Sequence, residues 1–153
     1  MHTTDGQEAE GDWTVETITS EGVDAPRLRI DADGHPSAIA QARDAADAFL
    51  GRLAAAVPPA GERARADVLL VVSELVTNAV RHAPGPLTLC LAPAPGAVQV
   101  TVCDTSPTPP RPRPGDLGGG TGGFGWPIVQ RLAHRVEVLP RPGGKEIRAL
   151  LPW

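Results

Sequence analysis

The chain has 153 residues, of which 41% are hydrophobic, and a formal net charge of −4. This length suffices for one folded domain with a tail and is too short for two ordinary hydrophobic cores. No stretch approaches about 20 uninterrupted apolar residues, so no membrane span is predicted. The start of the chain lacks the basic and apolar stretches of a secretory signal, and we therefore expect a cytoplasmic location.

Charge divides the chain at about residue 25. Residues 1–25 hold seven of the 18 acidic residues and neither Lys nor Arg, so the remainder carries a net charge of +3. This composition is typical of a disordered, solvated tail, and the alternative is an arm that docks on the body or on a basic partner. A charge of +3 is far from the clustered basic face of a nucleic-acid-binding protein. The expected organisation is a tail over residues 1–25 and one domain over residues 26–153.

The first half of this domain predicts one strand and two helices. Residues 26–31 alternate polar and apolar side chains, as a half-buried strand does. A first helix opens near Pro36, carries an apolar stripe at three- and four-residue intervals, and ends at Pro58. A second helix runs from near Gly61 to His82 and is apolar around more than half of its circumference, which indicates burial between layers.

The second half predicts two hairpins, a loop and a third helix. Residues 87–91 and 98–102 alternate in polarity and indicate an antiparallel pair of strands. A stretch rich in Pro and Gly at 107–120 fits neither helix nor strand, and a helix follows at 126–134. Residues 136–151 predict a closing hairpin. This order favours an α+β two-layer sandwich, in which a mixed, mainly antiparallel sheet has its helices on one face.

Two polar side chains interrupt the apolar second helix. Glu74 and Asn78 are four residues apart and therefore lie on one helix face. An amide oxygen suits Mg²⁺, and a carboxylate one turn away can orient a hydroxyl or accept its proton. An ordinary solvated helix face has the same pattern, so the pair alone is a weak indication of a site.

Asp104 ends the second strand of the first hairpin, on the face that we expect to pack against the helices. Its carboxylate can accept a hydrogen bond from an exocyclic amine. It can equally cap the turn that begins with Thr105, Ser106 and Pro107, and the residue types alone favour the turn.

Residues 118–125 are rich in glycine and run directly into the third helix. Glycines at such a place let backbone N–H groups approach phosphates, and the start of a helix favours negative charge. Residues 120–125 spell G-x-G-x-x-G, but no strand precedes them, so they are not a dinucleotide-binding fingerprint, and the chain has no Walker motif. The alternative interpretation is a flexible linker.

Together these elements resemble the conserved boxes of the GHKL (Bergerat-fold) ATPases. The run from Ser73 to His82, which contains Glu74 and Asn78, is especially similar to that of the small anti-sigma-factor serine kinases of bacteria. Asp104 after a strand and the glycines at 122–125 continue the resemblance, which covers about residues 26–153.

The resemblance implies ATP and Mg²⁺ as cofactors. Asn78 would bind a Mg²⁺ ion that bridges the ATP phosphates, and Glu74 would be the base for the hydroxyl of a protein substrate. Asp104 would bind the adenine amine. The glycines that would wrap the phosphates are Gly122, Gly123 and Gly125. Arg43 on the first helix would lie at the partner-binding surface, and its alternative is an ordinary exposed helix arginine.

Three positions depart from the family pattern. The first glycine box, usually D-x-G-x-G, begins Asp104-Thr105-Ser106 here. Thr121 stands where such a kinase can carry a basic residue that stabilises the γ-phosphate. Glu146, after Lys145, stands where a Thr is often found.

Two functions follow from this resemblance. The first is an anti-sigma factor that binds a sigma factor or similar client and phosphorylates a serine or threonine of a STAS-type antagonist. The second, motivated by Thr121 and the unusual loop, is a nucleotide-gated partner-binding switch with little or no kinase activity. Family members often pair as dimers, so the sequence leaves undecided whether this chain forms a homodimer. Neither nucleic acid nor a membrane is expected as a partner.

Overall fold

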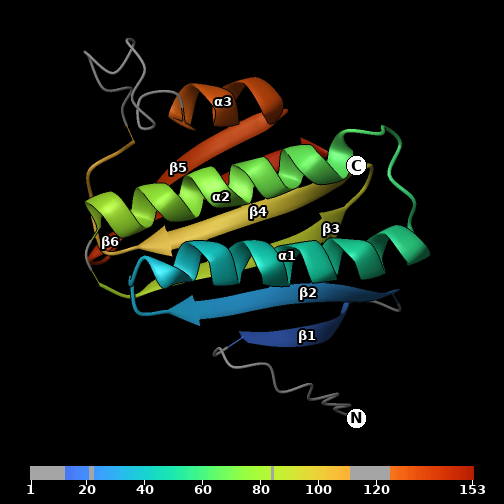
Figure 1. Cartoon of the computed structure of the whole chain (residues 1–153), viewed down its shortest axis with the longest axis horizontal. Coiled ribbons are helices and arrows are strands. Elements are labelled where there is room, and N and C mark those ends of the chain that lie inside the picture. Colours follow the sequence, from blue (N-terminus) through green and yellow to red (C-terminus); the bar gives the residue numbers. More distant parts are fainter. Residues whose placement is uncertain (1–12, 21–22, 84, 111–124) are drawn as a thin grey trace.

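A computed structural model describes residues 13–20, 23–83, 85–110 and 125–153 (Figure 1). The chain begins with β1 (Trp13–Ser20) and β2 (Val23–Ala32), followed by α1 (Ser37–Ala56) and α2 (Ala64–His82). A hairpin of β3 (Leu87–Ala94) and β4 (Ala97–Asp104) comes next. The last elements are α3 (Gly125–Leu132), β5 (Arg135–Arg141) and β6 (Gly144–Pro152).

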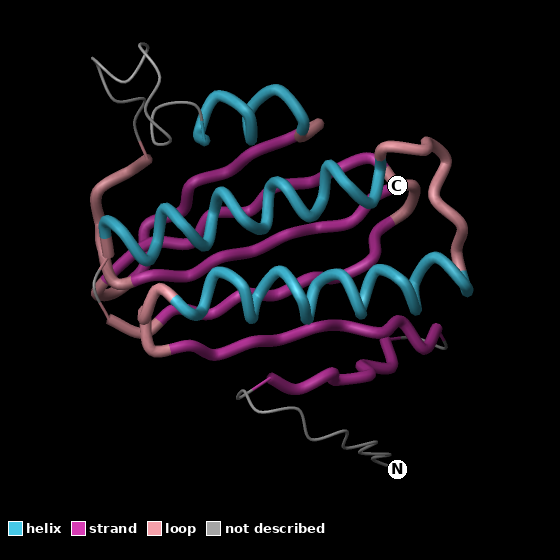
Figure 2. The backbone as a smooth tube through the Cα atoms, in the orientation of Figure 1, coloured by secondary structure: helices cyan, strands magenta, loops and turns pink. Residues whose placement is uncertain are grey.

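The strands form one sheet in the order β1-β2-β3-β4-β6-β5. Each pairing among these strands is antiparallel. The helices α1, α2 and α3 lie on the same face of this sheet (Figures 1 and 2). The predicted α+β two-layer sandwich is therefore confirmed, and the described part of the sheet is antiparallel throughout instead of mixed.

The strand β1 was not predicted from the sequence. It pairs with β2 from Trp13 opposite Ile30 to Ser20 opposite Val23, so β2 begins at Val23 and not at residue 26. Five of its eight residues are β-branched and favour an extended backbone, although the surrounding residues 1–25 are acidic in composition. Residues 1–12 lie outside the described residues, and the division of the chain into a tail and a domain stays a prediction.

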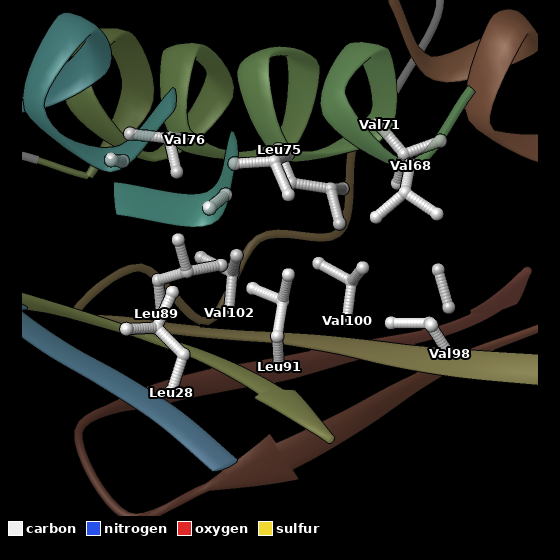
Figure 3. Packing of buried hydrophobic residues seen from close by; sticks show 14 of the residues in the cluster. Leu28, Val68, Val71, Leu75, Val76, Leu89, Leu91, Val98, Val100 and Val102 are labelled. Atoms are coloured by element: carbon white, nitrogen blue, oxygen red, sulfur yellow. The ribbon is translucent and has the colours of Figure 1, made fainter. Parts of the chain in front are cut away.

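The hydrophobic core fills the space between the helices and the sheet (Figure 3). Alternate residues of each central strand point into it, because side chains in a strand alternate between the two faces. The second helix is buried along much of its length, as its composition predicted. Its buried side chains are Ala64, Val68, Val71, Val72, Leu75, Val76 and Ala79. Opposite them, β4 contributes Val98, Val100 and Val102.

The start of β6 lies unusually close to the end of β4. In their register, Lys145 is opposite Asp104 and Glu146 is opposite Cys103. A Cβ atom on Gly144 would overlap the backbone carbonyl of Asp104, so only glycine allows this approach. As a result the end of β4, the start of β6 and the C-terminal end of α2 meet at one end of the molecule (Figure 1).

None of the described helices is both long enough and apolar enough to cross a membrane.

Candidate functional site

Glu74 lies where α2 meets the start of α3. Its side chain is half-buried, and its carboxylate is so close to Gly125 that a Cβ atom added there would overlap Oε2 and lie 3.3 Å from Cδ. Gly125 is the first residue of α3. Because the start of a helix carries a partial positive charge, the carboxyl group of Glu74 lies beside the positive end of α3. The structure thus brings together two residues that the sequence placed 51 positions apart.

Asn78, one turn further along α2, lines a pocket of about 270 Å³. The walls come from the last turns of α2, the loop after β4 and the start of β6. The other lining residues are His82, Ser106, Thr108, Pro109, Pro110 and Lys145. The volume is close to the lower end of the range of about 300–1,000 Å³ that small-molecule sites occupy. The lining residues include an amide, two hydroxyls and an ammonium group, which can form hydrogen bonds with a ligand. These groups belong to Asn78, Ser106, Thr108 and Lys145.

Asp104 and Lys145 form a buried ion pair at this end of the sheet. The ammonium Nζ of Lys145 lies 3.0 Å from Oδ1 and 2.9 Å from Oδ2 of Asp104. The side chains of Lys145 and Asp104 are only 3% and 1% exposed. Lys145 also donates a hydrogen bond of 3.1 Å to the backbone carbonyl of Ser106. Such a pair is tolerated in the interior because each ion also forms a hydrogen bond with the backbone of Ser106.

Asp104 also caps the turn that follows β4. The backbone N–H of Ser106 donates to Oδ1 of Asp104 over 2.9 Å. The turn interpretation of Asp104 is therefore confirmed, as is the prediction that its side chain faces the helices. Its assignment to an adenine amine stays a prediction.

Sequence reasoning named Lys145 but missed its pairing with Asp104. The sequence signal for this pairing was that the two residues carry opposite charges and that each lies at the end of a strand, with its side chain on the helix-covered face of the sheet. It could be used only with the β4–β6 register, which no local pattern specifies.

The other predicted site residues are only partly placed by the structure. Arg43 lies on the exposed side of α1, which fits both a partner-binding surface and an ordinary solvated arginine. Gly122 and Gly123 lie outside the described residues, as does Thr121, whereas Gly125 begins α3. The roles assigned to all of these residues stay predictions.

The donors around the pocket suit a magnesium–phosphate complex better than a metal held by protein alone. Within the described ranges, no group of three or more His, Cys, Asp or Glu side chains is arranged to hold a metal ion. Mg²⁺ commonly binds through one or two protein oxygens together with substrate phosphates and water. The amide oxygen of Asn78 fits that requirement.

Comparisons with known proteins agree with the fold. The family described as histidine kinase-like ATPase domain matches residues 34–151 of this chain. A comparison with curated proteins found no match.

Among solved structures, the chain is similar to the RsbU and RsbW domains of Rv1364c from Mycobacterium tuberculosis. The identity is 20% and the TM-score 0.62, over 86% of this chain and 33% of that one. The histidine kinase domain of a blue-light activated histidine kinase from Erythrobacter litoralis EL346 is 24% identical, with a TM-score of 0.46, over 70% of this chain and 60% of that one. At this identity the first similarity shows a shared fold, and this chain spans about a third of the first structure's length.

Proposed function

The chain belongs to the histidine kinase-like ATPase domain family, and we propose that it is an ATP-binding regulatory protein that phosphorylates a serine or threonine of an antagonist protein. The observation that carries this proposal is the arrangement along α2. Asn78 lies on the wall of a polar pocket, and Glu74, one turn away, lies against the start of α3. One face of a single rigid helix therefore offers an oxygen for a metal–phosphate complex and a carboxylate for a hydroxyl.

Asn78 and Glu74 would have different roles in phosphoryl transfer. A bound Mg²⁺ ion would neutralise charge on the phosphates, which is a large part of catalysis in such reactions. Asn78 would fix the position of that complex with its amide oxygen. Glu74 would orient the attacking hydroxyl of the protein substrate and accept its proton. Since α2 is packed along its other side into the core, both groups are held on a rigid support.

The partner side of the proposal rests on the resemblance of the run from Ser73 to His82 to anti-sigma-factor kinases. We propose a sigma factor or similar client, and an antagonist of the STAS type as substrate. Arg43, exposed on α1, is the proposed contact with a partner. A homodimer is compatible with this proposal.

The binding test measures Mg·ATP affinity by isothermal titration. Asn78→Ala should weaken binding at least about tenfold, since a hydrogen bond or ligand bond to a charged group contributes about 1.5–3 kcal/mol. Gln41→Ala, which removes an exposed amide from α1, is the control and should bind as the wild type does. Unchanged affinity in Asn78→Ala would remove this residue from its assigned role.

The transfer test uses ATP labelled at the γ-phosphate and the cognate antagonist. Glu74→Gln should lower the rate of label transfer at least about 100-fold, the usual contribution of a general base, while Mg·ATP still binds. Tight ATP binding by the wild type without transfer to a verified antagonist would instead establish the second function, a nucleotide-gated partner-binding switch.

A further inference from the structure

A second pocket lies on the face of the sheet that the helices leave uncovered (Figure 1). Its volume is about 300 Å³, and its walls come from β2, β3, β4 and β6. Arginines stand on two sides of it, Arg27 and Arg29 on β2 and Arg148 on β6. Shorter side chains of the two strands between them also line it. These are Cys90, Ala92, Gln99 and Thr101.

This pocket has an excess of positive charge. Among its described lining residues the only acidic one is Glu146, which is 6% exposed and already paired with Arg141 and Arg148. Arg148 uses its Nε atom for that pair, which leaves its two terminal nitrogens for another acceptor. Arg27 is exposed and has no hydrogen bond or ion pair with another described residue. Because guanidinium groups bind carboxylates with paired hydrogen bonds, the pocket suits a ligand with several carboxylates.

The start of the same chain has the matching charge. Residues 1–12 contain four acidic residues and neither Lys nor Arg. Three of the four, Glu8, Glu10 and Asp12, are at alternate positions. In an extended backbone their carboxylates would therefore all point to one side.

This acidic segment is also long enough and close enough to reach the pocket. It ends at Trp13, which opens β1 opposite Ile30 of β2, the neighbour of Arg29. Arg29 and Arg148 lie in one row across the sheet, separated by one residue of β3 and one of β4, so about 14 Å separate their backbones. Five extended residues span about 16 Å. Residues 8–12 can therefore cross from β2 to β6.

We propose that residues 8–12 dock on this pocket and pair with Arg27 and Arg148. Exposed ion pairs are individually weak. A segment tethered beside its site has an effective concentration on the order of millimolar, which makes weak contacts sufficient. This inference is independent of the proposed function, since Asn78 lies on the other side of the sheet. The docked segment would close a basic surface to acidic segments of other proteins.

The thiol of Cys90 reports whether the pocket is covered. Cys90 is half-buried and lines the pocket, whereas Cys103 is half-buried on the same face and is not among the lining residues. The test measures alkylation of each thiol by iodoacetamide in the full chain at low salt, followed by mass spectrometry. Replacing Glu8 and Glu10 by Gln and Asp12 by Asn in one triple variant should raise the rate at Cys90 at least about fivefold. The rate at Cys103 should stay within twofold.

Arg27→Gln tests the pocket side of the contact. It should also raise the rate at Cys90, although the loss of a nearby positive charge alone would make the thiol less reactive. Added to the triple variant, Arg27→Gln should cause no further rise, because the contact is already lost. Arg52→Gln, at an exposed position of α1, is the control and should change neither rate.

Three results would overturn the inference. The first is an equal rate at Cys90 in the wild type and the triple variant. The second is an equal rise at Cys90 and Cys103, which would indicate a general loosening of the sheet. The third is protection of Cys90 that grows with protein concentration, since a second copy of the chain would then cover this face.

Discussion

Lys145 and Glu146 are neighbours on β6 that face opposite sides of the sheet. Lys145 belongs to the candidate site, whereas Glu146 lies on the face that the helices leave uncovered (Figure 1). Glu146 accepts a hydrogen bond of 2.8 Å from Nε of Arg141 and also pairs with Arg148. Burial would raise the pKa of Glu146, but the hydrogen bonds from Arg148 and Arg141 outweigh it and hold the pKa below its ordinary value.

This lowered pKa makes the contribution of Glu146 to stability dependent on pH. A carboxylate with a depressed pKa in the folded state stabilises the fold above its unfolded pKa, near 4.5, and loses that contribution as pH falls through the folded value. Glu146→Gln should therefore lower the free energy of unfolding by about 1 kcal/mol at pH 7, since its arginine partners are partly exposed.

Thermal unfolding of the wild type and Glu146→Gln at pH 7 and pH 3 checks this prediction. The difference between the two proteins should be smaller at pH 3 than at pH 7, because the contribution of the Glu146 charge falls progressively once the pH is below 4.5, the ordinary pKa at which the unfolded chain takes up the proton. Glu62→Gln, at an exposed position, is the control. An equal difference at both pH values would show that the loss comes from packing and not from charge.

At the scale of elements, the decisive contact is the approach of β6 to the end of β4. Gly144→Ala would place a Cβ atom into the carbonyl of Asp104 and 3.1 Å from Cα of Thr105. These are backbone atoms, which cannot rotate away as a flexible side chain can. We expect a loss of about 3 kcal/mol or more in the free energy of unfolding, at the upper end for overpacking.

Urea denaturation measures this loss, with Gly61→Ala as the matched control. A Cβ on Gly61 would meet nothing within 4 Å, so its effect should stay within about 0.5 kcal/mol. Gly144→Ala should also weaken nucleotide binding, because a displaced β6 carries Lys145 with it. If Gly144→Ala and Gly61→Ala were equally stable, the strands β4 and β6 could move apart at little cost in free energy. The close approach of Gly144 to Asp104 would then not hold Lys145 in place.

At the scale of the whole molecule, the C-terminal residue joins elements that are distant in the sequence. Trp153 is 6% exposed, and its ring N–H donates to the carbonyl of Val57 over 2.8 Å. Its backbone N–H donates to the carbonyl of Gly96 over 3.0 Å. The end of α1 and the turn between β3 and β4 are thereby fixed to β6, at the end of the sheet opposite the candidate site.

Local patterns were enough to determine the fold class and the spacing of the main polar residues. Alternation identified the hairpins, and three- and four-residue spacing identified the helices, because each periodicity follows directly from local backbone geometry. Glu74 and Asn78 share a helix face for the same reason. The strand β1 was missed because the acidic composition of residues 1–25, in which it lies, outweighed its own β-branched residues in the interpretation. Its partner strand supplies the backbone hydrogen bonds that hold it.

Only the tertiary structure decided which polar side chains meet. Asp104 and Lys145 are 41 residues apart, and their pairing depends on a crossover through α3 and on the register of β4 with β6. The contact of Glu74 with Gly125 depends on where α3 docks on α2. Sequence periodicity specifies which face of an element is buried, whereas partners across elements are selected by packing and register, which arise only when the whole chain folds.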